Sequence, residues 1–224
     1  QPLSFSVSET AECVHIHIID AELMGKGEKE KKDLYIEGVQ NNGIINHYEY
    51  IINSEGTIEI RHVLKPEGKM PLWFPRIGLT LTVSDALDQV KWYGRGPQEN
   101  YPDRKTGYPM GIYASTVQAM YEPYLMPQDY GLRTDVRWLQ LTTDKGIGLQ
   151  FKMNEWFNFN IYPYSTDNLT KAMYTYQLQK QKGMTLNLDY ATTGVGCTAR
   201  GVFGAYKAMP QEYRRTISIR PMMK

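Results

Sequence analysis

The sequence has few cysteines, no long apolar runs and little net charge. Its 224 residues include two cysteines and carry a formal net charge of +1. So small a charge argues against nucleic acid or an acidic membrane as a partner, because both select a concentrated basic field. No run approaches the roughly 18 apolar residues of a membrane-spanning helix, and the first residues lack the pattern of a signal peptide. We therefore expect neither a nucleic-acid nor a membrane partner.

Catalytic and metal-binding motifs are missing as well. Cys13 and Cys197 lie far apart and give no CxxC or metal-ligand spacing, so two unpaired buried thiols are favoured over one disulfide. Nucleophile-elbow, zinc-protease, P-loop and dinucleotide-binding motifs are also absent. We therefore expect no catalytic residue, no metal site and no cofactor in this chain.

What the sequence does contain is alternation of apolar and polar residues, the pattern of antiparallel strands with one buried face. The alternating segments are 14–18, 58–63, 79–83, 136–141, 148–153, 157–161, 186–190 and 216–220. One short helix is expected within 165–174, with Asp167 as its N-cap. The pattern predicts a single all-β domain over residues 1–224, made of two large antiparallel sheets packed face to face.

Two stretches interrupt the alternation. Residues 94–131 contain five prolines, and loops of this length in a compact domain usually carry function or form an interface. Residues 192–204 contain four glycines and little apolar content. These stretches are the places where we look for a site.

Four carboxylates lie in or beside the proline-rich stretch, and hydrolysis of a glycosidic bond needs two such groups. They are Glu99, Asp103, Asp129 and Asp135. Side chains of this kind in long loops usually cap turns and form ion pairs. We interpret Glu99 beside Arg95, and Asp103 beside Arg104, as loop-stabilising pairs rather than catalytic groups.

His15 and His17 lie two residues apart on an expected strand and therefore share one face. A metal-binding pair is one interpretation. We favour two polar-face residues on a half-exposed strand, because no third ligand lies nearby in the sequence.

Residues 92–104, WYGRGPQENYPDR, resemble the signature of the C-terminal domain, or small chain, of glycoside hydrolase family two β-galactosidases. The resemblance continues through 121–138 and covers roughly residues 57–220, although Asp129-Tyr130 departs from the family's usual run. It implies an antiparallel β-supersandwich like that of galactose mutarotases. The residues that we expect to hold this signature loop together are Trp92, Arg95, Glu99, Asn100, Asp103, Arg104, Arg133 and Asp135.

The resemblance implies a non-catalytic domain of a larger enzyme that hydrolyses terminal β-D-galactosides, such as lactose-like sugars, with retention. The catalytic glutamates and a magnesium ion would lie on a separate (β/α)₈ barrel, the expected partner, so the isolated chain is expected to be inactive. The chain is expected to lack the opening strands of the full family domain. Oligomeric state and compartment, bacterial cytoplasm or periplasm, stay open.

In such enzymes a loop of this domain borders the substrate entrance, and it corresponds here to residues 196–201. Its candidate residues are Gly196, Cys197, Thr198 and Arg200. The tryptophan that the family carries there is missing, so a surface loop without sugar contact is the favoured interpretation.

Two alternatives remain. A carbohydrate-binding module would stack sugars on exposed aromatic side chains; the candidates are Tyr101, Tyr108, Tyr121, Tyr124 and Trp156. A mutarotase-like enzyme would need a histidine and a carboxylate on one concave face, for which His47 and His62 are the candidates.

Overall fold

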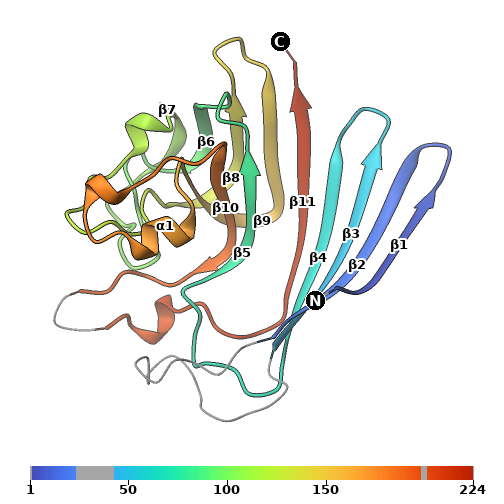
Figure 1. Ribbon diagram of the computed structural model, residues 1–224, viewed down its shortest axis with the longest axis horizontal. Helices are drawn as coiled ribbons and strands as arrows, with labels where there is room; N and C mark the ends of the chain where they lie inside the picture. Colours follow the sequence, from blue (N-terminus) through green and yellow to red (C-terminus); the bar gives the residue numbers. More distant parts are fainter. Residues whose placement is uncertain (1, 24–42, 198–200, 224) are drawn as a thin grey trace.

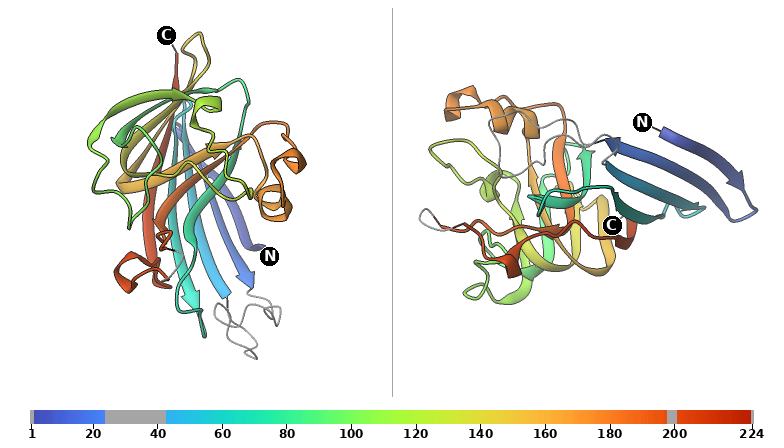
Figure 2. Two further views of the ribbon diagram at one scale, coloured as in Figure 1. Left: turned by 90° about the vertical axis from the view of Figure 1, so that its left-hand side faces the viewer. Right: turned by 90° about the horizontal axis from the view of Figure 1, so that it is seen from below.

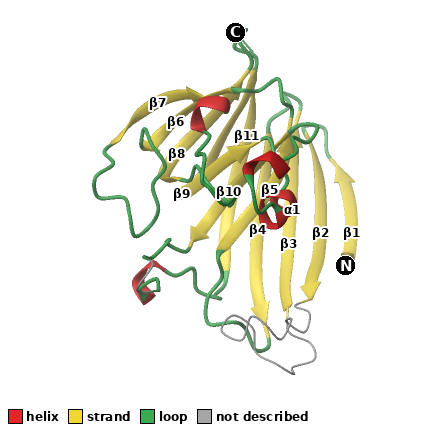
Figure 3. Cartoon of the chain, turned by 60° about the vertical axis from the view of Figure 1, so that its left-hand side comes forward, coloured by secondary structure: helices red, strands yellow, loops and turns green. Residues whose placement is uncertain are grey.

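The computed structural model describes residues 2–23, 43–197 and 201–223, which form eleven strands, one α-helix and three short 3₁₀ turns (Figure 1, Figure 3). No helix among these residues is long and apolar enough to cross a membrane. The strands are β1 (Pro2–Glu9), β2 (Cys13–Leu23), β3 (Gly43–Asn53), β4 (Ile58–Glu67), β5 (Arg76–Val83), β6 (Gln89–Arg95), β7 (Met110–Thr116), β8 (Arg133–Thr142), β9 (Gly148–Tyr162), β10 (Met184–Thr192) and β11 (Tyr213–Met222). The helix is α1 (Thr166–Lys171), and the 3₁₀ turns are η1 (Gln118–Met120), η2 (Thr175–Gln177) and η3 (Gly204–Tyr206).

All strand pairs are antiparallel, which confirms the expected fold class. The main path runs β1-β2-β3-β4-β11-β9-β8-β6-β7, and β10 joins β9 to β5. The first part of β9, Gly148–Met153, pairs with β11, whereas Asn158–Tyr162 pairs with β10. The expected segments 148–153 and 157–161 are therefore one strand, and the two layers are joined through it.

The main hydrophobic core is formed by side chains of β5 and β10 together with side chains of β4, β6, β8, β9 and β11. Trp92 of β6, Phe159 of β9 and Leu188 of β10 are fully buried in one cluster. The Nδ1 atom of His62 on β4 lies 2.7 Å from the Tyr190 hydroxyl on β10, although β4 and β10 are not sheet neighbours. Each large apolar side chain buried here stabilises the fold by about 1.5–3 kcal/mol.

Strands β1 to β3 form a wing that extends from this body (Figure 2). β1 is an edge strand, and its Leu3, Phe5 and Val7 are exposed. The next strand, β2, has no buried side chain among its described residues. The wing is thus a pleated sheet with both faces partly open to solvent.

The structure corrects several local expectations. Strands β1, β3, β6 and β7 lie outside the predicted segments, and β6 takes in the start of the signature loop. The expected short helix forms, but its N-cap is Ser165, whose hydroxyl accepts the Asn168 N–H at 3.0 Å. The predicted cap, Asp167, pairs with Lys171 instead. Both cysteines are free, but the expected burial is wrong, because Cys13 is partly exposed and Cys197 is exposed.

Candidate functional site

Glu99 is the centre of the signature loop. It is buried, and its carboxylate accepts hydrogen bonds from Tyr101 Oη at 3.0 Å, Arg104 Nη2 at 2.9 Å, Gly131 N–H at 2.9 Å and the Tyr124 hydroxyl. Burial alone would raise the pKa of Glu99, but these donors together lower it below its ordinary value. The carboxylate is therefore ionised and saturated with donors.

A second ion-pair group lies beside it. Arg95 Nε donates to Asp135 Oδ2 at 2.6 Å, and Lys105 Nζ donates to Asp135 Oδ1 at 2.9 Å. Burial would raise the pKa of Asp135, but these two cations lower it. The expected pair of Glu99 with Arg95 is wrong, because Arg104 is the cation that Glu99 binds.

Asp103 bonds to a distant part of the chain rather than to its neighbour Arg104. Its Oδ1 accepts the Val195 N–H at 3.0 Å and its Oδ2 accepts the Gly196 N–H at 2.7 Å. A Cβ on Gly194 would lie 2.3 Å from Asp103 Cγ, so only glycine admits this approach. Gly196 has a φ of +65°, in the left-handed region that favours glycine. The glycines at 194 and 196 therefore let the backbone wrap around the Asp103 carboxylate.

Three further signature residues bind backbone groups of the loop or of the segment 131–134 beside it. Asn100 Oδ1 accepts the Thr134 N–H at 3.0 Å, and Trp92 Nε1 donates to the Arg95 carbonyl at 3.0 Å. Arg133 lies over the Trp92 ring at 5.4 Å and donates to the Gly131 carbonyl at 2.8 Å. Burial lowers the pKa of Arg133 to about 10.

The signature loop forms one wall of a cavity of about 880 Å³. Tyr101 and Arg104 lie on this wall, and Gly194 and Val195 continue it. The other lining side chains include Trp73, Arg76, Tyr124, Gln128 and Asp129. A mixture of aromatic faces with cationic and anionic groups is suited to binding a polar ligand that also has apolar surface.

The floor of the cavity rests on a buried polar network. Arg76 Nη2 donates to Asp189 Oδ2 at 2.9 Å and to Asn160 Oδ1 at 3.3 Å, and lies 3.4 Å from Asp129. Burial raises the pKa of Asp189, and Arg76 opposes that change. Asn160 Nδ2 in turn donates to Asp129 Oδ1 at 2.8 Å. Asp129, the fourth carboxylate considered from the sequence, is thus held by two neighbours.

The predicted entrance loop lies only partly within the described residues. Gly196 follows directly on the cavity wall at Val195, and Cys197 is exposed. Thr198 and Arg200 lie outside the described residues. The structure thus brings Gly196 to the signature loop through Asp103, a link that no local sequence pattern indicated.

The two histidines considered for mutarotase-like chemistry do not line the cavity. His62 is buried in the core, where its Nε2 lies 3.1 Å from Asn46 Oδ1, and burial lowers its pKa to about 4. His47 lies on β3 of the wing. Neither histidine is therefore placed to act on a ligand in the cavity.

Of the aromatic residues proposed for sugar stacking, Tyr101 and Tyr124 line the cavity. Trp156 is exposed elsewhere, with the Arg137 guanidinium 3.4 Å from its ring centroid. Sequence reasoning missed Trp73, which lines the cavity from the segment before β5. It also missed Glu49 on β3, which lies beside His15 and His17 on the wing.

Comparison with known proteins decides the family. The family model described as "Beta galactosidase small chain" matches residues 8–219. This chain belongs to the β-galactosidase small-chain family. That result confirms the resemblance carried by residues 92–104.

Individual relatives agree with the family model. A β-galactosidase of Priestia megaterium (strain DSM 319 / IMG 1521) is 38% identical over 147 residues, which are 66% of this chain and 14% of the relative. One from Vibrio cholerae serotype O1 is 39% identical over 122 residues, 54% of this chain and 11% of the relative. The chain thus spans a small part of the curated relatives it matches.

Among solved structures, galactose 1-epimerase from Lactobacillus acidophilus matches this chain over 97% of its residues and 65% of the epimerase chain, with a TM-score of 0.49 and 10% sequence identity.

Proposed function

We propose that this chain is a non-catalytic domain of a β-galactosidase that hydrolyses terminal β-D-galactosides with retention. The catalytic glutamate pair and a magnesium ion would belong to a barrel domain on which this one packs. One observation carries the proposal: the carboxylates of the signature region already have structural partners. Glu99 has four donors, Asp135 has two cations and Asp103 has two backbone N–H groups. A group so fully engaged is a poor proton donor or nucleophile.

The proposed task of the domain within the enzyme is to shape the substrate entrance. Support comes from the link between Asp103 and Val195-Gly196, which holds the start of the candidate entrance loop against the signature loop. Val195 and Val202, which flank the entrance loop, line the same cavity as Tyr101 and Arg104 of the signature loop. A rigid signature loop would therefore position the entrance loop at the edge of the barrel.

The first experiment is an activity assay with nitrophenyl β-D-galactoside. We expect the isolated chain to give no turnover above the blank and the full-length protein of the same gene to give clear turnover. Turnover by the isolated chain that disappears in Asp129→Asn would overturn the proposal. Asp129 suits this purpose because its side chain is partly exposed and lines the cavity.

The second experiment tests the entrance role in the full-length protein. Asp103→Asn keeps the side-chain volume but weakens the hold on Val195 and Gly196. We expect a higher KM with a smaller change in kcat, because the entrance contacts the substrate in both ground and transition states. Asp144→Asn, in the exposed turn between β8 and β9, is the control. Equal KM and kcat in both variants would remove the entrance role while leaving the family assignment intact.

A second candidate function is carbohydrate binding by the domain itself. The cavity combines Trp73, Tyr101 and Tyr124 with the polar groups of Arg104 and Asp129, which suits a sugar with one apolar face. We expect millimolar galactose to change the tryptophan fluorescence of the isolated chain.

Two variants locate any such response. Trp73→Ala should abolish the fluorescence change, whereas Trp156→Ala, which removes an exposed tryptophan outside the cavity lining, should keep it. A fluorescence spectrum insensitive to galactose, or a response lost only in Trp156→Ala, would reject binding in this cavity.

A further inference from the structure

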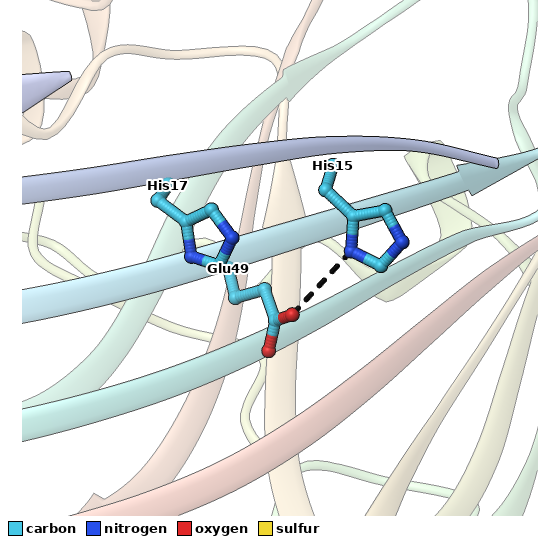
Figure 4. A group of neighbouring side chains, drawn as sticks. All are labelled: His15, His17 and Glu49. Carbon is cyan, nitrogen blue, oxygen red and sulfur yellow. Dashed lines mark ion pairs between the residues drawn. The ribbon is translucent and has the colours of Figure 1, made fainter. Parts of the chain in front are cut away.

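The polar face of the wing gathers three potential metal ligands from two strands (Figure 4). His15 and His17 are two residues apart on β2 and therefore point to the same face. The register of β2 and β3 places Glu49 directly opposite His17. One ligand atom of each side chain lies within 4.8 Å of the others.

The carboxylate of Glu49 is oriented by a neighbour. Its Oε1 lies 3.5 Å from His15 Nδ1, while its Oε2 accepts a bond from Arg61 Nη1 at 3.1 Å. Arg61 also donates to Glu59 Oε1 at 2.8 Å, so two carboxylates surround one guanidinium. One oxygen of Glu49 thus faces the histidines, and the positive charge that would repel a cation is already neutralised. A hydrogen bond to the second oxygen is the usual way in which proteins orient a ligating carboxylate.

The strands that carry the three side chains are regular, since β2 pairs with β3 from Cys13↔Asn53 to Leu23↔Gly43 without a register shift. Ligands on paired strands are held more precisely than ligands on loops.

We propose that His15, His17 and Glu49 form a binding site for a divalent transition metal of the zinc class, with the remaining coordination positions open to water or a ligand. Two imidazoles and one carboxylate are a ligand set that zinc uses in proteins when it keeps an open position. Bound zinc would need its ligand atoms about 2.0–2.2 Å from the ion, which these half-exposed side chains reach by rotating inward. Magnesium is disfavoured because it demands oxygen ligands.

Such a metal would connect β2 to β3 in the part of the chain that has little core of its own. It would stabilise the wing by mass action, because the unfolded chain does not hold the three ligands together. The site lies on the opposite face of the wing from Tyr48, which packs against the core beside His62. It is independent of the proposed function, because the cavity lining includes none of its residues.

The test is a calorimetric titration of the chain, without an affinity tag and after treatment with a chelator, with zinc sulfate. We expect one zinc ion per chain, no binding of magnesium chloride, and cobalt absorption in the visible range typical of an N/O-ligated site. The double variant His15→Ala, His17→Ala should lose zinc affinity by at least about 100-fold, and Glu49→Gln by about 10-fold or more. Circular dichroism checks that each variant is folded.

Matched controls locate the site. His47→Ala removes another histidine from the same face of β3, and Cys13→Ser with Cys197→Ser removes the free thiols; both should bind zinc as the unchanged chain does. Zinc affinity that is unchanged in the double histidine variant would overturn the proposal. So would the absence of zinc binding at about 100 μM, or its loss in the thiol variant.

Discussion

The signature loop and the wing both place acidic side chains beside cations, yet they do so in opposite environments. The Glu99 side chain is 7% exposed and receives four donors, whereas the Glu49 side chain is 26% exposed, accepts one bond from Arg61 and lies 3.5 Å from His15 Nδ1. In the loop every lone-pair direction is used, so the charge holds the fold. On the wing one carboxylate oxygen of Glu49 is bound by Arg61, and the other faces the histidines at the longer distance of 3.5 Å. Burial and the number of donors, rather than the residue types, decide which acid is free to bind a ligand.

Among the variants that test this contrast, Glu99→Gln is expected to lower the stability of the fold the most. The change removes the charge that Arg104 binds and leaves the N–H of Gly131 with a weaker acceptor in a buried place. We expect a loss of about 3 kcal/mol in the free energy of unfolding, measured by urea denaturation. The control is Glu122→Gln in the same region: burial and the charge of Glu99 raise the pKa of Glu122, so its neutralisation should be neutral or slightly stabilising. A loss below about 1 kcal/mol for Glu99→Gln would mean that the charge of Glu99 contributes as little to stability as the charges on the wing, and the contrast would fail.

The difference in stability between the unchanged chain and Glu99→Gln should depend on pH, because the pKa of Glu99 is lowered in the folded state. A group whose folded pKa is lowered contributes stability above its unfolded pKa, about 4.3 for Glu, and this stability is lost as the pH falls through the folded pKa. The stability gap between the unchanged chain and Glu99→Gln should therefore be constant near neutral pH and shrink below about pH 4. Urea denaturation of both proteins at a series of pH values, from neutral to below about pH 4, measures this gap in the free energy of unfolding. A gap that stayed constant into strong acid would show that the charge of Glu99 is not what holds the loop.

Asp103→Ala should have an intermediate effect. It removes two hydrogen bonds to Val195 and Gly196 at a half-buried position, for an expected loss of about 1–2 kcal/mol and a lower Tm. Hydrogen exchange should speed up at these two amides before it does so in the core strands. Asp144→Ala in an exposed turn should change stability by less than about 0.5 kcal/mol. An unchanged Tm for Asp103→Ala would mean that Asp103 does not stabilise the signature loop, and a direct functional role of the loop would have to be considered again.

The smallest effect is expected on the wing. Without metal, the double variant His15→Ala, His17→Ala should change the free energy of unfolding by less than about 0.5 kcal/mol, because half-exposed ion pairs contribute little. Thermal unfolding in the presence of a chelator measures it. A loss above about 1.5 kcal/mol would mean that the histidines, like Glu99, are structural, and the contrast between the two regions would disappear.

The alternation of apolar and polar residues predicted most of the strands, because it shows which face of a strand is buried. It located β2, β4, β5, β8, β10 and β11 as well as both halves of β9. It could not find β6, since Gly94 occupies an inward position where an apolar residue would have continued the pattern. A Cβ there would lie 2.9 Å from Val136 Cγ2, so close packing with β8 required glycine at the cost of the signal. The predicted interruption at the signature loop therefore began inside a strand.

By itself the sequence determined the antiparallel all-β class, through its alternation, and the family, through residues 92–104. Only the tertiary structure decided which charges meet. Asp103 binds backbone 92 and 93 residues away, and Glu49 stands opposite His17 because of the register between β2 and β3. Local periodicity specifies which face a side chain takes but not which strand lies next to it. Those neighbours follow from the order of strands in the sheet, which forms only when the whole core is buried at once.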